Sequence, residues 1–179
     1  MKEWFKENPL VTFAVKALAI YLIWYVAYEL VILPDGRVDR WLSLNIISVS
    51  GGVLDLLGYD VYTAGRIIGI GESAGIMLVN GCNGLEAIGL FLGFVIAYPG
   101  DNVKRAIYIA IGMMVIYLVN VLRIVVLAIT QVFWAEFFDF THDYSTTAIF
   151  YMVIFVLWMI WANLGESPAA AKKTSPNVA

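Results

Sequence analysis

The stretch VKRAIYIAIGMMVIYLVNVLRIVVLAITQVF, from Val103 to Phe133, decides the fold class of this chain. A helix needs about 20 apolar residues to cross a hydrocarbon core of about 30 Å, and this run exceeds that length. Beyond its basic first residues, Arg123 is the one charged side chain in the run. An arginine at the centre of a membrane helix costs about 2.5–3.5 kcal/mol on insertion scales, and less near the lipid headgroups. Arg123 therefore has either a function or a route to the headgroups.

The composition extends this conclusion to the whole chain. Of its 179 residues, 61% are hydrophobic and 14% are charged, whereas soluble proteins have about 45–50% and about 25%. The chain is therefore predicted to be an integral membrane protein. Its single cysteine, Cys82, excludes an internal disulfide and is either a reactive thiol or an apolar filler. The sequence contains no basic patch suited to nucleic acid.

Three further apolar runs predict the rest of a helical bundle: Leu10 to Leu33, Leu85 to Tyr98, and Thr147 to Trp161. The last two are short and must recruit flanking residues to span. The segment from Trp41 to Leu57 is weaker and is predicted to be an amphipathic helix at the membrane surface, with a tilted span as the alternative. The fold class is therefore an all-α membrane protein, a multi-pass helical bundle of about four spans plus this helix.

A small β-hairpin-like segment is predicted between Tyr59 and Gly81. The β-prone runs Arg66 to Ile70 and Ile76 to Val79 are separated by a stretch that contains Gly71, Ser73 and Gly75. Because the open edges of a hairpin would leave backbone groups unsatisfied in lipid, this segment is expected outside the hydrocarbon.

Basic residues orient the bundle. One side of the four-span arrangement collects Lys2, Lys6, Lys16, Lys104, Arg105, Lys172 and Lys173. The other side has only Arg37, Arg40 and Arg66, so both termini are predicted to be cytoplasmic in a plasma (inner) membrane. Residues 1–164 form the predicted membrane domain, and residues 165–179 a disordered cytoplasmic tail.

Three chemically capable residues are predicted to share one depth at the outer face. A helix rises about 28 Å from Lys104 to Arg123 and about 24 Å from Tyr98 to Cys82. His142, the only histidine, comes just before the last span. Each has a plainer interpretation: a buried small hydrophobe for the thiol, snorkelling for the arginine, and an interfacial loop position for the histidine.

Together these residues favour acyl transfer. A helix N-terminus and a nearby cation increase the thiolate fraction of a cysteine. Gly81 and Gly84 allow the close backbone approach that attack on a substrate carbonyl requires. A nucleophile at Cys82, a base at His142 and a fixed cation at Arg123 are the minimal parts of such a site.

Other residues are candidates for substrate binding or support. Asn120 shares a helix face with Arg123 and either holds the guanidinium, binds substrate, or serves as interhelical glue. Glu86, four residues after Cys82, either pairs with Arg123 or complements the helix dipole. Asn83 and Gly84 follow the cysteine directly. Asp139 and Asp143 flank His142 and either orient its ring or cap helices.

These residues resemble the exosortase/archaeosortase group of multi-pass membrane cysteine transpeptidases. The resemblance rests on GCNG (81–84) at a span start, on NVLR (120–123) late in the next span, and on a histidine ahead of the last span. It covers roughly Tyr59 to Trp161, so the membrane domain is expected to be exosortase-like. Many members have serine where this chain has Asn83, and many have more spans.

The resemblance implies a protein-sorting enzyme. Such enzymes cut exported proteins that carry a C-terminal motif, a transmembrane helix and a basic tail, and pass the new carboxyl terminus to a lipid or other cell-surface acceptor. By position, Cys82 would be the nucleophile, Arg123 the oxyanion stabiliser or substrate positioner, and His142 the general acid/base. The resemblance implies no metal and no organic cofactor.

Two rival functions belong to other classes. In a non-catalytic membrane assembly or scaffold protein, the polar residues would join helices and the thiol would be filler. A small transporter or channel would need a polar stripe through the bilayer. The middle parts of the predicted spans, Leu90 to Ile96 and Met113 to Leu118, offer only glycine, apolar residues and Tyr117, which argues against transport.

Overall fold

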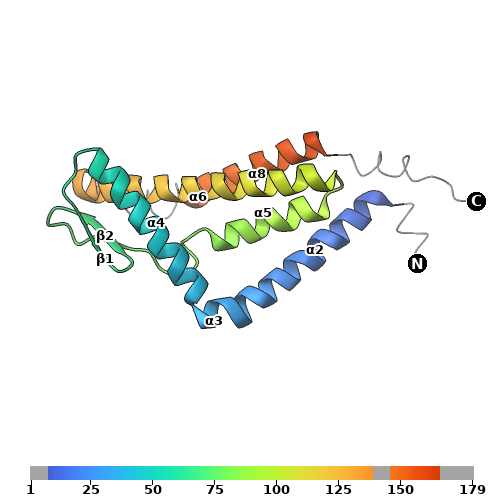
Figure 1. Cartoon of the computed structure of the whole chain (residues 1–179), viewed down its shortest axis with the longest axis horizontal. Helices are drawn as coiled ribbons and strands as arrows, with labels where there is room; N and C mark the ends of the chain where they lie inside the picture. Colours follow the sequence, from blue (N-terminus) through green and yellow to red (C-terminus); the bar gives the residue numbers. More distant parts are fainter. Residues whose placement is uncertain (1–7, 139–145, 166–179) are drawn as a thin grey trace, which may run out of the picture.

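The computed structural model describes residues 8–138 and 146–165 and is mostly helical (Figure 1). The long helices are α2 (Pro9–Ala27), α4 (Arg37–Leu56), α5 (Leu85–Ala97), α6 (Asn102–Phe133) and α8 (Thr146–Leu164). Within the described residues, two helices are long and apolar enough to cross a membrane, Leu10–Asp35 and Asn102–Phe133. The apolar helices Leu85–Ala97 and Ala148–Leu164 are shorter, so the count of four spans stays a prediction. Of the predicted tail, only Gly165 is described.

Helices α2 and α4 form the two arms of a V with α3 (Leu33–Asp35) at its vertex (Figure 1). A π-helical turn, Tyr28–Ile32, joins α2 to α3. Gly36 then takes a left-handed conformation with φ 65°, which separates α3 from α4. The predicted amphipathic helix is thus present, and it begins at Arg37 rather than at Trp41 because Gly36 sets its start.

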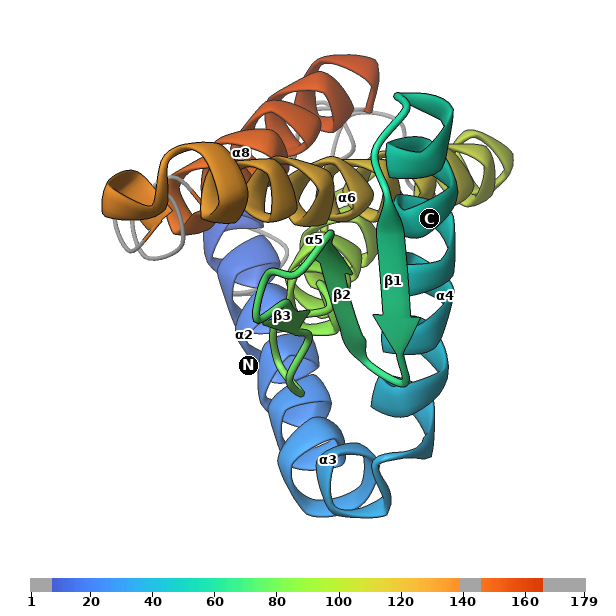
Figure 2. The ribbon, with the colours of Figure 1, turned by 90° about the vertical axis from the view of Figure 1, so that its left-hand side faces the viewer.

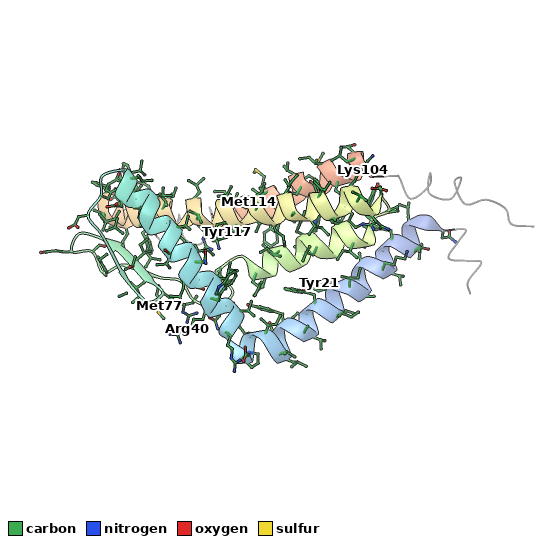
Figure 3. The ribbon with its side chains drawn as sticks, in the orientation of Figure 1. Tyr21, Arg40, Met77, Lys104, Met114 and Tyr117 are labelled. Atoms are coloured by element: carbon green, nitrogen blue, oxygen red, sulfur yellow. The ribbon has the colours of Figure 1, made fainter. Side chains whose placement is uncertain are left out.

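One face of α4 is buried. Its buried residues are Asp39, Leu42, Ser43, Ile46, Ile47, Ser50, Gly51 and Leu54. This three-and-four spacing is that of a helix packed along one stripe. The stripe lies against α6, where Ser50 Oγ donates to the carbonyl of Val121 at 3.4 Å. Tyr117 of α6 also reaches α4, and its hydroxyl donates to Asn45 Oδ1 at 3.3 Å (Figure 3).

A three-stranded antiparallel sheet covers the junction of α4 and α6 (Figure 2). Its strands are β1 (Val61–Ala64), β2 (Ile67–Ile70) and β3 (Ile76–Met77), in the order β1-β2-β3. The β2–β3 pair, with Ile68 opposite Ile76, is the hairpin that the sequence predicts. Strand β1 was not predicted, and it pairs with β2 through a tight turn at Gly65.

Contacts of aromatic side chains join several helices at one end of the bundle. Phe13, near the start of α2, lies 5.5 Å from the rings of Phe94 and Tyr98 at the end of α5. Gly100, in the α5–α6 turn, lies against Trp161 of α8. The start of α2, this turn and the end of α8 therefore meet at one end, where Figure 3 labels Lys104. The Cys82 loop lies at the other end of α5.

Asp101 begins α6 and gives a pH-dependent prediction. Its Oδ1 accepts hydrogen bonds from the backbone N–H groups of Lys104 at 2.9 Å and Val103 at 3.0 Å. These bonds hold the pKa of the Asp101 carboxyl below its usual value, and the bond from Lys104 has the larger effect. A carboxylate with a lowered pKa stabilises the fold above its unfolded pKa, and this stabilisation is lost as the pH falls through the folded pKa.

We therefore expect Asp101→Ala to lower the melting temperature of the detergent-solubilised protein at neutral pH, because it removes the N-cap of α6. Asp101→Asn keeps an acceptor oxygen and should melt closer to wild type. As the pH falls through the lowered pKa of Asp101, the wild-type carboxyl is protonated and the gap between wild type and Asp101→Ala should close. A gap that is independent of pH would show that the carboxylate has no such role.

Candidate active site

The loop that carries Cys82 connects β3 to α5 and is held at several points. The Cys82 N–H donates to the carbonyl of Val79 at 3.2 Å, which closes a turn. Arg66, beside β2, donates to the side-chain oxygen of Asn80. Gly81 and Gly84 have φ of 82° and 83°, a region that side chains other than glycine rarely adopt. The two glycines therefore let the chain fold tightly around Cys82 before α5 begins at Leu85.

Arg123 reaches this loop from α6. Its Nη1 donates to the carbonyl oxygen of Cys82 at 2.9 Å. The ring of Phe150 lies 5.9 Å from the guanidinium carbon. The structure thus brings together two of the three residues that the sequence places at one depth. The third, His142, and its neighbours Asp139 and Asp143 lie outside the described residues.

A cavity of about 520 Å³ opens beside the half-buried thiol. Its walls come from α2 and the following π-helical turn, from the cysteine loop and α5, and from α6 and α8. They consist of Tyr21, Trp24, Tyr25, Tyr28, Glu29, Gly81, Cys82, Gly84, Glu86, Ala87, Leu90, Arg123, Phe150, Tyr151 and Ile154. Figure 3 shows Tyr21 on the side of α2 that faces α5. Six of these fifteen residues are aromatic, and the wall also holds a thiol, one cation and two carboxylates.

Glu86 is exposed in this cavity, in the first turn of α5. No ion pair joins it to Arg123 in the described part of the chain. Its Oε1 lies instead over Gly81, 3.3 Å from where a Cβ would stand. Of the two roles that the sequence allows, its position at a helix N-terminus fits the complement to the helix dipole.

Asn83 is buried, with 2% of its surface exposed, and its amide is fully used. Its Nδ2 donates to Oδ1 of Asp39 at 2.8 Å and to the Asp39 carbonyl at 3.3 Å. Its Oδ1 accepts the backbone N–H of Leu85 at 3.1 Å. Asn83 therefore joins the start of α5 to α4. Asp39 was not predicted as part of the site; its signal in the sequence is an acidic residue on the apolar stripe of an amphipathic helix.

Asn120 is fully buried beside Gly84. A Cβ at Gly84 would stand 3.3 Å from its Nδ2. Neither Nδ2 nor Oδ1 of Asn120 has a hydrogen-bond partner in the described part of the chain, so the amide does not hold the Arg123 guanidinium there. Buried amides are almost always paired, so the unpaired amide of Asn120 calls for an explanation.

The fold and the cavity together define a helical membrane protein with a thiol and a guanidinium at one end of its bundle. A family model described as transmembrane exosortase matches residues 4–159. The chain therefore belongs to the transmembrane exosortase family, as the resemblance noted above indicated. No curated protein and no solved structure matches the chain.

Proposed function

We propose that this exosortase-family protein is a cysteine-type peptidase and transpeptidase that cleaves the C-terminal sorting signals of exported proteins. The observation that carries the proposal is the hydrogen bond from Arg123 Nη1 to the backbone carbonyl of Cys82 at 2.9 Å, with both residues in the wall of an open cavity. A cation fixed on the residue that bears the thiol can serve both thiolate formation and charge stabilisation in the transition state. Family membership supports the same reaction class.

The proposed reaction has two steps. The Cys82 thiolate attacks the scissile carbonyl carbon, and the Arg123 guanidinium balances the charge that develops on the carbonyl oxygen. The C–N bond then breaks, His142 protonates the leaving amine, and a thioester remains on the enzyme. In the second step an acceptor hydroxyl or amine on a lipid or the cell surface attacks the thioester, His142 takes the acceptor's proton, and Cys82 leaves as thiolate.

The unpaired amide of Asn120 gives it a place in this reaction. It lies beside Gly84, whose neighbourhood a substrate backbone must enter to reach Cys82. An amide side chain offers both a donor and an acceptor to a peptide group. We assign Asn120 to substrate binding, in preference to interhelical glue, because a glue residue would already have its partner.

The aromatic part of the cavity fits an extended peptide. Tyr21, Trp24 and Tyr25 from α2 and Phe150 and Tyr151 from α8 line the cavity. Aromatic rings with polar tips suit the boundary between lipid and water. The signal's transmembrane helix would lie in the bilayer beside α5, α6 and α8, with both termini of the enzyme cytoplasmic and the site extracytoplasmic.

The thioester is the observation that tests the proposal. The full-length protein is expressed in its own cell with its exported proteins, isolated under denaturing acid, and digested. We expect a fraction of the Cys82 peptide to carry a substrate fragment that neutral hydroxylamine removes, because thioesters are cleaved by hydroxylamine whereas amides are stable. Cells that trim the exported C-termini while Cys82 stays unmodified would exclude covalent catalysis.

The same cells separate the scaffold alternative. A filler thiol stays unlabelled by a membrane-impermeant maleimide and carries no fragment, and exported C-termini stay intact. An accessible catalytic thiol is labelled rapidly. Since Cys82 is the only cysteine, all label on the chain reports this one site.

A further inference from the structure

We propose that Asp39 of α4 is a positioning residue for the proposed reaction: through the amide of Asn83 it sets the orientation of the loop that presents Cys82. This inference rests on the proposed function, in which Cys82 is the nucleophile. It concerns a buried carboxylate that comes 44 residues before Asn83 in the sequence and does not line the cavity.

Asp39 is fully buried and is the centre of a small polar cluster. Its Oδ1 accepts Nδ2 of Asn83 at 2.8 Å and the hydroxyl of Tyr28 at 3.3 Å. Tyr28 is itself buried and forms part of the cavity wall. One carboxylate oxygen therefore joins three elements, the π-helical turn after α2, the helix α4 and the cysteine loop.

The cluster gives the loop a second attachment besides the one to Arg123. The Cys82 carbonyl is bound by a side chain of α6, whereas the next side chain, Asn83, is bound by one of α4. These two bonds on consecutive residues leave the peptide between them little freedom to rotate. The direction in which the thiol meets a substrate therefore depends on both.

Packing alone does not explain a carboxylate at this position. The other buried residues of the α4 stripe that contact the core are chiefly aliphatic, and an isolated buried charge opposes folding. Oδ2 of Asp39 has no hydrogen-bond partner in the described part of the chain. An aliphatic side chain would fill the same space without this cost. We therefore attribute the carboxylate at this position to the hydrogen bonds that its Oδ1 accepts from Asn83 and Tyr28.

Three variants test the pairing. Asp39→Leu removes the acceptor oxygen and keeps a similar volume. Asn83→Asp replaces the donor amide with an oxygen that faces the oxygens of Asp39. Asp39→Asn is the conservative variant, because its amide oxygen can still accept from Asn83 and from Tyr28.

The first measurement is hydrogen exchange of the loop in the full-length detergent-solubilised protein, with D₂O as the probe. We expect the amides of the peptide that contains Cys82 and Leu85 to exchange about tenfold faster in Asp39→Leu and in Asn83→Asp, because the loop opens more often. Asp39→Asn keeps the acceptor oxygen and should stay within about threefold of wild type. Ser43→Ala is the matched control, since Ser43 is a buried polar residue one turn further along the same stripe.

The second measurement is the rate at which exported proteins lose their C-terminal helices in cells producing each variant. We expect at least a tenfold loss in Asp39→Leu and Asn83→Asp, a rate near wild type in Asp39→Asn, and no change in Ser43→Ala. Equal exchange in wild type and Asp39→Leu would overturn the proposal, as would a folded Asp39→Asn protein whose loop exchanges as fast as that of Asp39→Leu. If wild-type cells trim nothing, the proposed function fails, and the exchange data still decide whether Asp39 positions the loop.

Discussion

Replacing Cys82 with serine is expected to stop the trimming of exported C-terminal signals, with a loss of more than about 10³-fold. The substitution replaces only the sulfur atom. The hydrogen bonds of the loop should persist, because Arg123 binds the backbone carbonyl of residue 82 and Asp39 binds the side chain of Asn83. A serine hydroxyl is a far weaker nucleophile than a thiolate and needs a dedicated base for its activation. The loss therefore falls on the chemical step.

The measurement is the fraction of intact C-terminal signals in cells that produce each variant at equal membrane levels. Val79→Ala is the control, because Val79 is exposed on the same loop and its role in the turn is made by its backbone carbonyl. If the serine variant retains more than about a tenth of the wild-type rate, Cys82 is not the nucleophile and the scaffold alternative gains support.

Arg123→Lys is expected to lower the trimming rate by about 10²–10³-fold although it keeps the positive charge. The guanidinium already uses one N–H on the Cys82 carbonyl and has further donors in a fixed plane for a developing oxyanion. Lysine is a compact charge on a flexible stem and does not reproduce this planar geometry. Arg123→Gln, which also removes the charge, should lose at least as much.

Arg40→Lys is the matched exchange, because Arg40 is exposed on α4 (Figure 3), and it should trim at the wild-type rate. Melting temperatures of the purified variants separate a catalytic loss from an unstable fold. A folded Arg123→Lys protein with wild-type activity would show that only a diffuse positive charge is needed, and would assign the oxyanion to another donor.

The ends of the apolar helices were predictable because local residues set them. Helix α6 begins at Asn102, one residue before the predicted start, since Asp101 caps it. Helix α5 begins at Leu85 as predicted, since Gly84 adopts a conformation that ends the preceding loop. Strand β1 was missed because four residues without strict alternation give a weak signal. It forms only because β2 and the surface of α4 support it.

The site was predictable in part for a similar reason. Helical rise alone places Cys82 and Arg123 at similar depths, and the contact between them follows once α5 and α6 pack side by side. The partners of Asn83 were not predictable, because Asp39 lies on a helix whose position depends on the turn at Gly36 and on packing against α6. No local sequence pattern predicts which polar residues meet when they are 44 residues apart in the chain.

The length of α5 bears on the proposed substrate. With 13 residues it rises about 20 Å, well short of the about 30 Å of a bilayer core. On the four-span prediction, the membrane thins around this helix, or the thiol lies in a depression below the outer headgroups. On the proposed function, α5 is then a ruler: a signal anchored by its basic tail at one end presents its scissile bond to Cys82 only when the intervening helix has a matching length.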